Sequence, residues 1–503
     1  MSLPANISTV TDTALKTYYE LYDLACLKTL NDYNEAINCF NKLLLQNKGL
    51  SEQEKEYCKL RVARNIERNK ERDKSGKPMK CKYCNSTRYS KRYCENCIRE
   101  YLRGEFSKWS SDDETVDKFI QKNQLQSSVP PYILEWIPFE NDQFENITYL
   151  TDGGFSKIHC AKWKRGPIID WDENKREFIY DGPIDVVLKS LNDSSEKFYD
   201  EVNNYFKIKS GNLIKCYGIT KFPNSDNYVM VMNYYKEGTL RDYLKGHRSR
   251  ISLKDKIYFI YRICFALNRI HSKNFIHRDL HSANILLLTN KCLIADLGLC
   301  GPAESKLANT YGVLPYMAPE LISNKQYSKA SDIYSLGMLM WEVFAEYPPF
   351  HDQPHDTDLA LAIVSGKRPP MLSEIPDIFQ QLILKCWKKD AKERPEIEEI
   401  RRIVNKEFIN AYEDEELMVK YENKRATEFL ETPKSPHPTR YTSGLLSIGD
   451  TENFKINSQF AITDSSLRYG RENDNGKVLR DKAENSGKAK IKNKGEPIKR
   501  TNI

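Results

Sequence analysis

The stretch that decides the fold is His277-Arg278-Asp279-Leu280-His281-Ser282-Ala283-Asn284. Two short motifs follow it along the chain, Asp296-Leu297-Gly298 and Ala318-Pro319-Glu320. In-line phosphoryl transfer needs a carboxylate at the attacking hydroxyl and oxygen ligands for magnesium, and Asp279, Asn284 and Asp296 are those residue types in that order. Either short motif alone is ordinary turn or helix-entry sequence, but the conjunction predicts a phosphoryl-transfer site.

Each residue of this predicted site has an expected role. Asp279 is the catalytic residue that orients and deprotonates the acceptor hydroxyl, while Asn284 and Asp296 each bind a Mg²⁺ ion that offsets phosphate charge. Arg278 is expected to pair with a phosphate carried by the segment between residues 298 and 318. The candidate acceptor hydroxyls in that segment are Ser305, Thr310 and Tyr311.

Upstream residues predict the nucleotide site. Residues 150–158 read as strand, glycine turn and strand over the ATP phosphates, because glycine lets backbone amides approach a ligand. The expected ATP contacts in this hairpin are Leu150, Gly153, Gly154, Phe155 and Ile158. Lys189 ends the apolar strand 186–189, where a lysine is anomalous unless an anion meets it, so it is predicted to be a catalytic residue that contacts the α/β-phosphates.

Two further elements complete the predicted ATP site. The helix partner of Lys189 is expected at Glu201, which follows Phe198 at helical spacing, with Asp200 as the adjacent alternative. Residues 229–235 read as a strand that continues into a hinge, whose backbone would bind adenine. The ATP contacts expected there are Met232, Asn233 and Tyr235.

Four cysteines form the one cluster among the thirteen in the chain. They occur as two CxxC pairs nine residues apart, at Cys81, Cys84, Cys94 and Cys97. Each pair can form a knuckle that supplies two thiolates to one tetrahedral Zn²⁺, and a reducing compartment disfavours disulfides as the alternative. The sequence therefore predicts a closed, structural zinc site that stabilises a segment too short to bury a core.

Composition limits the remaining classes. No window holds the roughly 18 uninterrupted apolar residues of a membrane span, and the N-terminus lacks the basic and apolar regions of a secretion signal. We therefore expect a cytoplasmic location, with the nucleus as the alternative. Much of the formal net charge of +7 belongs to residues 477–503, where nine Lys/Arg face three Asp/Glu. This tail, with few aromatic residues, is predicted to be disordered.

We expect a chain of 503 residues to form more than one domain. The predicted order is a helical region at 1–78, a zinc knuckle at 79–103, a linker at 104–143, a catalytic domain at 144–408 and a basic tail at 409–503. The helical region reads as an antiparallel hairpin with a third helix from Ser51, and one tetratricopeptide-like unit is the alternative. Residues 164–185 predict an extended loop or an extra hairpin.

The motifs resemble the eukaryotic protein kinase family. The catalytic loop, residues 311–320 and residues 331–337 are similar to its tyrosine-kinase-like branch. The CxxC pairs and residues 106–109, 134–138, 163–182 and 187–191 resemble the expanded kinase group of arbuscular mycorrhizal fungi. This resemblance implies an α+β bilobal protein kinase fold, ATP and Mg²⁺ as cofactors, and protein substrates. It also implies that Asp332 anchors the catalytic loop and that Glu320 pairs with Arg394.

Several positions depart from the family pattern. Thr151 and Ser156 replace two glycines of the phosphate-covering loop, Leu297 replaces the usual Phe, and Val313 replaces a Thr. His281 stands where serine/threonine kinases place a Lys two residues after the catalytic Asp. The resemblance still implies serine/threonine acceptors, because the chain lacks the catalytic loop of tyrosine kinases.

Three functions follow from these features. An active protein kinase is favoured because the five catalytic and metal-binding groups are intact. The altered glycine loop motivates an alternative, a pseudokinase scaffold, and the N-terminal helices or zinc knuckle are the surfaces expected to bind a protein partner in either case. Nucleic-acid binding through the knuckle and tail is the least favoured, because solvated charge on a small zinc module is common.

Overall fold

The computed structural model describes residues 10–30, 32–126, 129–139, 143–152, 156–191, 195–208, 211–223, 225, 227–289, 291–303, 310–324, 326–414, 416, 418, 419, 441, 444 and 445. Gly153, Gly154, Phe155 and Ser305 lie outside these residues. The predicted disorder of the tail also concerns residues that are, with few exceptions, outside the described part of the chain.

The N-terminal region consists of α1 (Asp12–Lys28), α2 (Tyr33–Gln46) and α3 (Glu52–Arg72). Ser51 and Glu54 form a reciprocal capping box at the start of α3, because each side chain bonds the backbone amide of the other. Tyr18, Phe40 and Ile66 lie in a buried core shared by the three helices. The predicted helical hairpin with a third helix is confirmed.

Residues 79–136 form a small module and a bridge to the main sheet. Its elements are β1 (Met79–Lys80), β2 (Thr87–Arg88), α4 (Glu95–Glu105), η2 (Phe106–Lys108), α5 (Glu114–Gln126), η3 (Pro130–Tyr132) and β3 (Glu135–Trp136). The segment 104–143, predicted to be a linker, contains α5, whose Val116 and Ile120 are fully buried in the main core. β3 pairs in parallel with β9, so this segment also supplies an edge strand.

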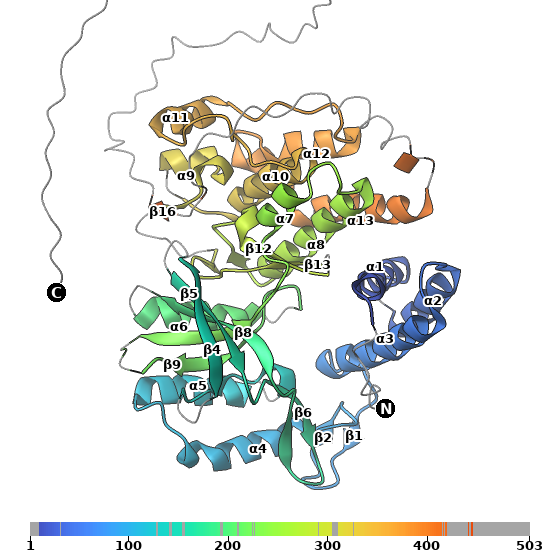
Figure 1. Cartoon of the computed structure of the whole chain (residues 1–503), viewed down its shortest axis with the longest axis vertical. Helices are drawn as coiled ribbons and strands as arrows, with labels where there is room; N and C mark the ends of the chain where they lie inside the picture. Colours follow the sequence, from blue (N-terminus) through green and yellow to red (C-terminus); the bar gives the residue numbers. More distant parts are fainter. Residues whose placement is uncertain are drawn as a thin grey trace, which may run out of the picture. The chain divides into compact units, whose positions relative to one another are not determined.

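The small lobe is a six-stranded sheet in the order β3-β9-β10-β8-β5-β4 (Figure 1). Its strands after β3 are β4 (Phe144–Asp152), β5 (Ser156–Trp163), β8 (Ile184–Leu191), β9 (Cys216–Lys221) and β10 (Tyr228–Asn233). The helix α6 (Ser195–Ile208) follows β8, and Phe198 and Val202 bury its apolar face. The predicted extra hairpin is present as β6 (Ile168–Asp172) and β7 (Glu177–Tyr180).

The large lobe is mainly helical. Its helices are α7 (Leu240–Gly246), α8 (Leu253–Ser272), α9 (Pro319–Asn324), α10 (Lys329–Ala345), α11 (Thr357–Ser365), α12 (Asp377–Cys386) and α13 (Ile397–Glu413), with short turns η4 (Ser282–Asn284), η5 (Leu314–Tyr316) and η6 (Ala391–Glu393). Its strands are β11 (Phe275–Ile276), β12 (Ile285–Leu288), β13 (Lys291–Ile294), β14 (Gly301–Pro302), β15 (Tyr311–Gly312) and β16 (Gly444–Leu445). From Ser331 to Ala345 every residue of α10 is buried, so this helix forms the centre of the lobe.

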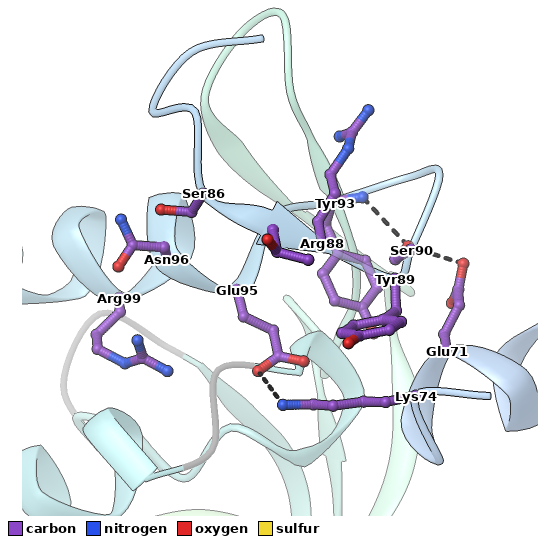
Figure 2. Close-up of a pocket in the computed structure, with 11 residues that line it drawn as sticks. Glu71, Lys74, Ser86, Arg88, Tyr89, Ser90, Tyr93, Glu95, Asn96 and Arg99 are labelled. Carbon is purple, nitrogen blue, oxygen red and sulfur yellow. Dashed lines mark hydrogen bonds and ion pairs between the residues drawn. The ribbon is translucent and has the colours of Figure 1, made fainter. Parts of the chain in front are cut away.

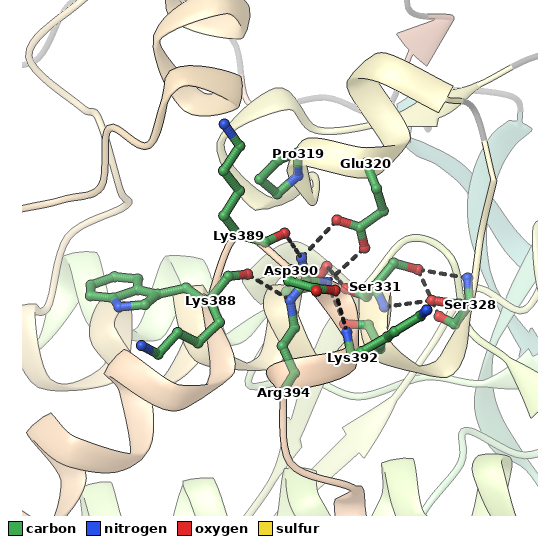
Figure 3. Close-up of polar contacts among 12 residues, drawn as sticks. Pro319, Glu320, Ser328, Ser331, Lys388, Lys389, Asp390, Lys392 and Arg394 are labelled. Carbon is green, nitrogen blue, oxygen red and sulfur yellow. Dashed lines mark hydrogen bonds and ion pairs between the residues drawn. The ribbon is translucent and has the colours of Figure 1, made fainter. Parts of the chain in front are cut away.

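An internal brace holds the large lobe together. Arg394 donates two hydrogen bonds to Glu320, Nη1 to Oε1 at 2.6 Å and Nη2 to Oε2 at 2.7 Å. Figure 3 shows the guanidinium between Glu320 and the loop at Lys388, whose carbonyl accepts a bond from Arg394 Nε at 2.9 Å. The Arg394 side chain is fully buried, so this two-bond pair is worth more than a solvent-exposed ion pair. The pairing implied by the family resemblance is present.

None of the described helices has the length and apolar character needed to span a lipid bilayer.

Candidate active site

Lys189 is at the centre of a buried charge cluster. Its Nζ lies 2.7 Å from Glu201 Oε1 and 2.9 Å from Asp296 Oδ1. The side chains of Lys189 and Glu201 are 8% and 0% exposed, whereas that of Asp296 is 44% exposed. Glu201 on α6, and not the exposed Asp200, is therefore the partner of the strand lysine. The cluster connects β8, which carries Lys189, with α6, which carries Glu201, and with the segment just after β13, which carries Asp296.

The electrostatics of this cluster favour the charged forms of Lys189 and Asp296. Burial acts to lower the pKa of Lys189, but the carboxylates of Asp296 and Glu201 outweigh it and raise that pKa. Burial acts to raise the pKa of Asp296, and the Lys189 ammonium reverses this, so the pKa of Asp296 is lowered. For Glu201, burial prevails over Lys189 and raises the pKa. A cationic lysine beside an ionised aspartate is what a phosphate and its magnesium require.

Asp332 at the start of α10 fixes the catalytic loop. Its Oδ2 accepts a hydrogen bond from the backbone amide of His277 at 2.8 Å, and its Oδ1 accepts one from Arg278 N at 2.9 Å. His271 Nε2 is also 2.8 Å from Asp332 Oδ2. Arg278 has a φ of +71°, a strained value for a residue with a side chain. The buried carboxylate, 1% exposed, therefore stabilises a backbone that would not otherwise persist.

Asp279 and Asn284 lie together at this loop. Asn284 Nδ2 donates to the Asp279 carbonyl oxygen at 2.9 Å and lies 3.3 Å from Asp279 Oδ2. The Ala295 amide donates to the Asn284 carbonyl at 2.8 Å, which connects the loop to the residue before Asp296. Three predicted site residues, separated by up to 17 positions, are thus positioned by a few short contacts.

Two neighbours of Asp279 differ in their partners. His281 Nε2 lies 3.5 Å from Asp279 Oδ1, so the histidine that departs from the family pattern lies beside the carboxylate predicted to be catalytic. Arg278 donates to the carbonyls of Leu299 and Pro302, at 3.2 and 3.1 Å.

Two of the candidate phosphorylation sites are described. Thr310 is 2% exposed, so its phosphorylation would require that the segment around it leave its described position. Tyr311 is half-buried.

The remaining described residues of the predicted ATP site lie on β4, β5 and β10, except Tyr235, which follows β10. Met232 is buried at 2% exposure and pairs with Val187 across β10 and β8, and the next pair is Asn233 with Val186. Asn233 also accepts a hydrogen bond from Tyr217 Oη at 2.9 Å. The other described contacts are Tyr235, which is buried, Ile158, which is half-buried, and Leu150, which is 48% exposed.

The four predicted zinc ligands converge. Sγ of Cys81 lies 3.6 Å from Sγ of Cys97, Sγ of Cys84 lies 3.6 Å from Sγ of Cys94, and all four sulfurs are within 4.8 Å of one another. Four sulfurs at about 2.3 Å from a tetrahedral zinc would be roughly 3.8 Å apart. Tyr83 N donates to Cys81 Sγ at 3.4 Å. The spacing and donors therefore fit Zn²⁺.

A polar pocket of about 260 Å³ borders the cysteine module (Figure 2). Glu71 at the end of α3 accepts a hydrogen bond from Ser90 Oγ at 2.7 Å, and Lys74 lies 3.9 Å from Glu95. Arg92 extends this network, because its guanidinium bonds Glu71 at 2.7 Å and Asp170 of β6 at 2.6 Å.

No local sequence pattern indicated the Arg92 bridge. Its two partners lie 21 and 78 residues away, and no local periodicity relates residues at such separations. The module also shares a core with the extra hairpin, in which Tyr101 packs edge-on against Trp171 at 5.0 Å. The CxxC spacing indicated the four predicted zinc ligands. No local sequence pattern indicated the surface against which the module packs.

Comparison with known proteins agrees with this geometry. Residues 144–404 match the family model described as protein tyrosine and serine/threonine kinase. Mitogen-activated protein kinase kinase kinase 7 of Bos taurus is 26% identical over 285 residues, which are 55% of this chain and 45% of that protein. RGS domain-containing serine/threonine-protein kinase A of Dictyostelium discoideum is 28% identical over 267 residues, 50% of this chain and 22% of that protein. The chain thus spans less than half the length of these curated relatives.

Proposed function

Because the chain belongs to the protein tyrosine and serine/threonine kinase family, we propose that it is a protein kinase that transfers the γ-phosphoryl group of ATP to serine or threonine hydroxyls. The observation that carries this proposal is Lys189, held by Glu201 and Asp296 at 2.7 and 2.9 Å. A buried lysine with two carboxylates costs desolvation energy, and contact with nucleotide phosphates gives that arrangement a use.

The residue roles follow from the geometry. Asp279 accepts the proton of the acceptor hydroxyl, and Lys189 binds the α/β-phosphates. Asn284 uses its amide nitrogen to bond Asp279, which leaves its amide oxygen to bind a cation beside Asp296. The family implies ATP and Mg²⁺, and the metal would supply charge neutralisation at the phosphate oxygens. For the contacts with ATP we propose Met232, Asn233 and Tyr235 at the adenine and the predicted hairpin residues over the phosphates.

The pseudokinase alternative has no observation in its favour among the residues that the structure describes. Lys189, Glu201, Asp279, Asn284 and Asp296 are all present, and their described contacts resemble a complete site. We therefore keep catalysis as the proposal for the whole chain.

The test is phosphorylation by the purified full-length chain with MgATP and a generic protein acceptor, followed by mapping of the modified residues. The wild type should phosphorylate mainly Ser or Thr, and Asp279→Asn should lower the rate by roughly 10²- to 10⁴-fold, the usual contribution of general acid–base catalysis. Asp358→Asn, on the exposed first turn of α11, serves as the matched control. Equal, background-level signals from wild type and Asp279→Asn would contradict the proposal.

We propose that Cys81, Cys84, Cys94 and Cys97 hold one structural Zn²⁺. Metal analysis of the full-length chain should find about one zinc per chain, as a four-thiolate site requires. Cys94→Ser should lose that zinc, while Cys160→Ser, a half-buried cysteine of β5, should retain it. Equal zinc content in both variants would exclude this site.

We also propose a cytoplasmic or nuclear location and the domain limits stated from the sequence, with protein partners at α1–α3 or the zinc module. None of the thirteen cysteines, all of which the structure describes, is in a disulfide, which agrees with a reducing compartment. Imaging of a fluorescent fusion tests the location directly, and a signal in the secretory pathway would contradict it.

A further inference from the structure

A segment from beyond the predicted catalytic domain lies against the activation segment. β16 (Gly444–Leu445) pairs antiparallel with β15, with Tyr311 opposite Leu445 and Gly312 opposite Gly444. A Cβ placed on Gly312 would lie 3.9 Å from Asp279 Oδ1, so this short sheet is directly beside the catalytic carboxylate. A distant part of the chain therefore occupies the space next to the site of transfer.

In the described part of the chain, Tyr327 occupies one edge of β15. Tyr327 Oη accepts a hydrogen bond from Tyr311 N at 2.8 Å and donates one to the Tyr311 carbonyl at 2.7 Å. Successive residues of a strand direct their backbone groups to opposite edges, so Gly312 presents its groups to the other edge. Gly444 pairs at that edge, and a second strand cannot pair there at the same time.

Tyr441 anchors this segment on the large lobe. Its carbonyl accepts a hydrogen bond from Arg241 Nη1 at 2.6 Å, and its hydroxyl donates to the Pro349 carbonyl at 3.1 Å. Its ring packs edge-on against His355 at 4.4 Å, with the Arg241 guanidinium 5.1 Å from the ring centroid. These contacts come from α7 and from the loop between α10 and α11, so the anchor spans two elements.

Arg241 joins this anchor to the catalytic loop. Its Nε donates to Ser282 Oγ at 3.0 Å, and Ser282 donates to the buried Glu342 at 2.6 Å. Ser282 lies three residues after Asp279. The segment is thus attached at one end to a side chain that contacts the catalytic loop and at the other end to the strand beside Asp279.

We propose that Tyr441 and Gly444–Leu445 occupy, in cis, the groove that receives the acceptor segment of protein substrates, and that they compete with those substrates. An acceptor hydroxyl must come within hydrogen-bond reach of Asp279, so the peptide that carries it must run beside Gly312. Addition of an extended strand to an open edge is a common mode of peptide binding. The sequence Tyr441-Thr442-Ser443-Gly444 also carries two hydroxyls between the two described anchor points.

The kinetic test uses the full-length chain and therefore rests on the proposed kinase function. With saturating MgATP, Tyr441→Ala should lower the KM for a protein acceptor by roughly tenfold and leave kcat nearly unchanged, because removal of an internal competitor raises the fraction of open groove. Tyr441→Phe, which keeps the ring but loses the bond to Pro349, should fall between Tyr441→Ala and wild type. Tyr469→Ala is the control, since it makes the same change elsewhere in the C-terminal region and should match the wild type.

A binding test separates this inference from the kinase function. A fluorescent synthetic peptide of residues 438–448 should bind Tyr441→Ala more tightly than the wild type, as measured by anisotropy, and unlabelled acceptor should displace it. Binding without any phosphoryl transfer would refute the kinase proposal and leave this inference standing. Equal acceptor KM for all four proteins, with no peptide binding to Tyr441→Ala, would overturn it.

Discussion

Asp23 on α1 and Arg262 on α8, 239 residues apart in sequence, form a buried ion pair. Arg262 Nη1 lies 3.0 and 2.8 Å from the two carboxylate oxygens, and Tyr258 Oη donates to Asp23 at 3.1 Å. The side chain of Arg262 is 6% exposed and that of Asp23 is 9% exposed. Since α8 is the long buried helix before the catalytic loop, this ion pair joins the N-terminal helices to the large lobe.

Removal of one partner of this pair should destabilise the chain. Asp23→Ala leaves the Arg262 guanidinium buried without its counter-ion, which typically costs about 3–5 kcal/mol. Thermal unfolding followed by circular dichroism should show a lower Tm for the transition that includes the large lobe. Glu67→Ala, on the exposed face of α3, is the control and should leave the transition in place.

A double substitution tests whether the pair itself is responsible. If Asp23→Ala and Arg262→Ala each destabilise the chain, the double variant should cost less than their sum, because it leaves no unpaired charge. Strict additivity of the two changes in unfolding free energy would show that packing, and not the ion pair, explains the loss.

The Lys189 partner makes a second prediction, for catalysis. Glu201→Gln should lower kcat on the order of 100-fold, because Lys189 would lose the group that positions it and small displacements of catalytic groups have such effects. Asp200→Asn provides a matched control at the adjacent, exposed position. Steady-state kinetics with MgATP distinguish the two. Similar losses for both variants would mean that Glu201 has no special role.

His281 makes a third prediction. It lies 3.5 Å from Asp279 Oδ1, and His281→Ala should lower kcat by about tenfold, equivalent to about 1.4 kcal/mol, with little change in the KM for ATP. His281→Lys should restore part of the rate, because an ammonium can contact the same carboxylate. His247→Ala, at the exposed histidine that follows the last residue of α7, is the control. No recovery with Lys would argue against a charge contact.

The zinc module makes a fourth prediction. Removal of zinc by a chelator should increase amide hydrogen exchange in residues 79–105 and in the hairpin β6–β7, because Arg92 and the shared aromatic core join the two. Helices α8 and α10 should keep their protection, since their cores lie in the large lobe. Arg92→Ala should loosen the hairpin while zinc stays bound. Protection unchanged by the chelator would contradict a structural role for the metal.

Much of the active site could be predicted from local sequence. Asp279, Asn284 and Asp296 belong to short motifs, and Lys189 and Glu201 stand out because one is a charge in an apolar strand and the other follows a helical period. The four cysteines are recognised by the spacing of their two CxxC pairs. In each case the informative residue is recognised from its own motif or element, where backbone geometry relates neighbouring positions directly.

The residues that join distant segments could not be predicted in this way. Asp23, Arg92, Arg241 and Tyr441 each look like ordinary polar or aromatic residues in their own surroundings. Their partners depend on how the helices and strands pack, and no periodicity carries that information. The residues 104–143 show the same limit, since their burial of Val116 and Ile120 depends on a surface that other segments provide.

The sequence by itself predicted the side chains proposed for phosphoryl transfer and zinc binding, because both need particular residue types in recognisable motifs. Tertiary structure alone decided which surfaces meet: α1 against α8 through Asp23, the zinc module against the β6–β7 hairpin through Arg92, and Gly444–Leu445 beside Asp279. The physical reason is that such contacts arise from burial and charge pairing between segments that are brought together only when the whole core forms.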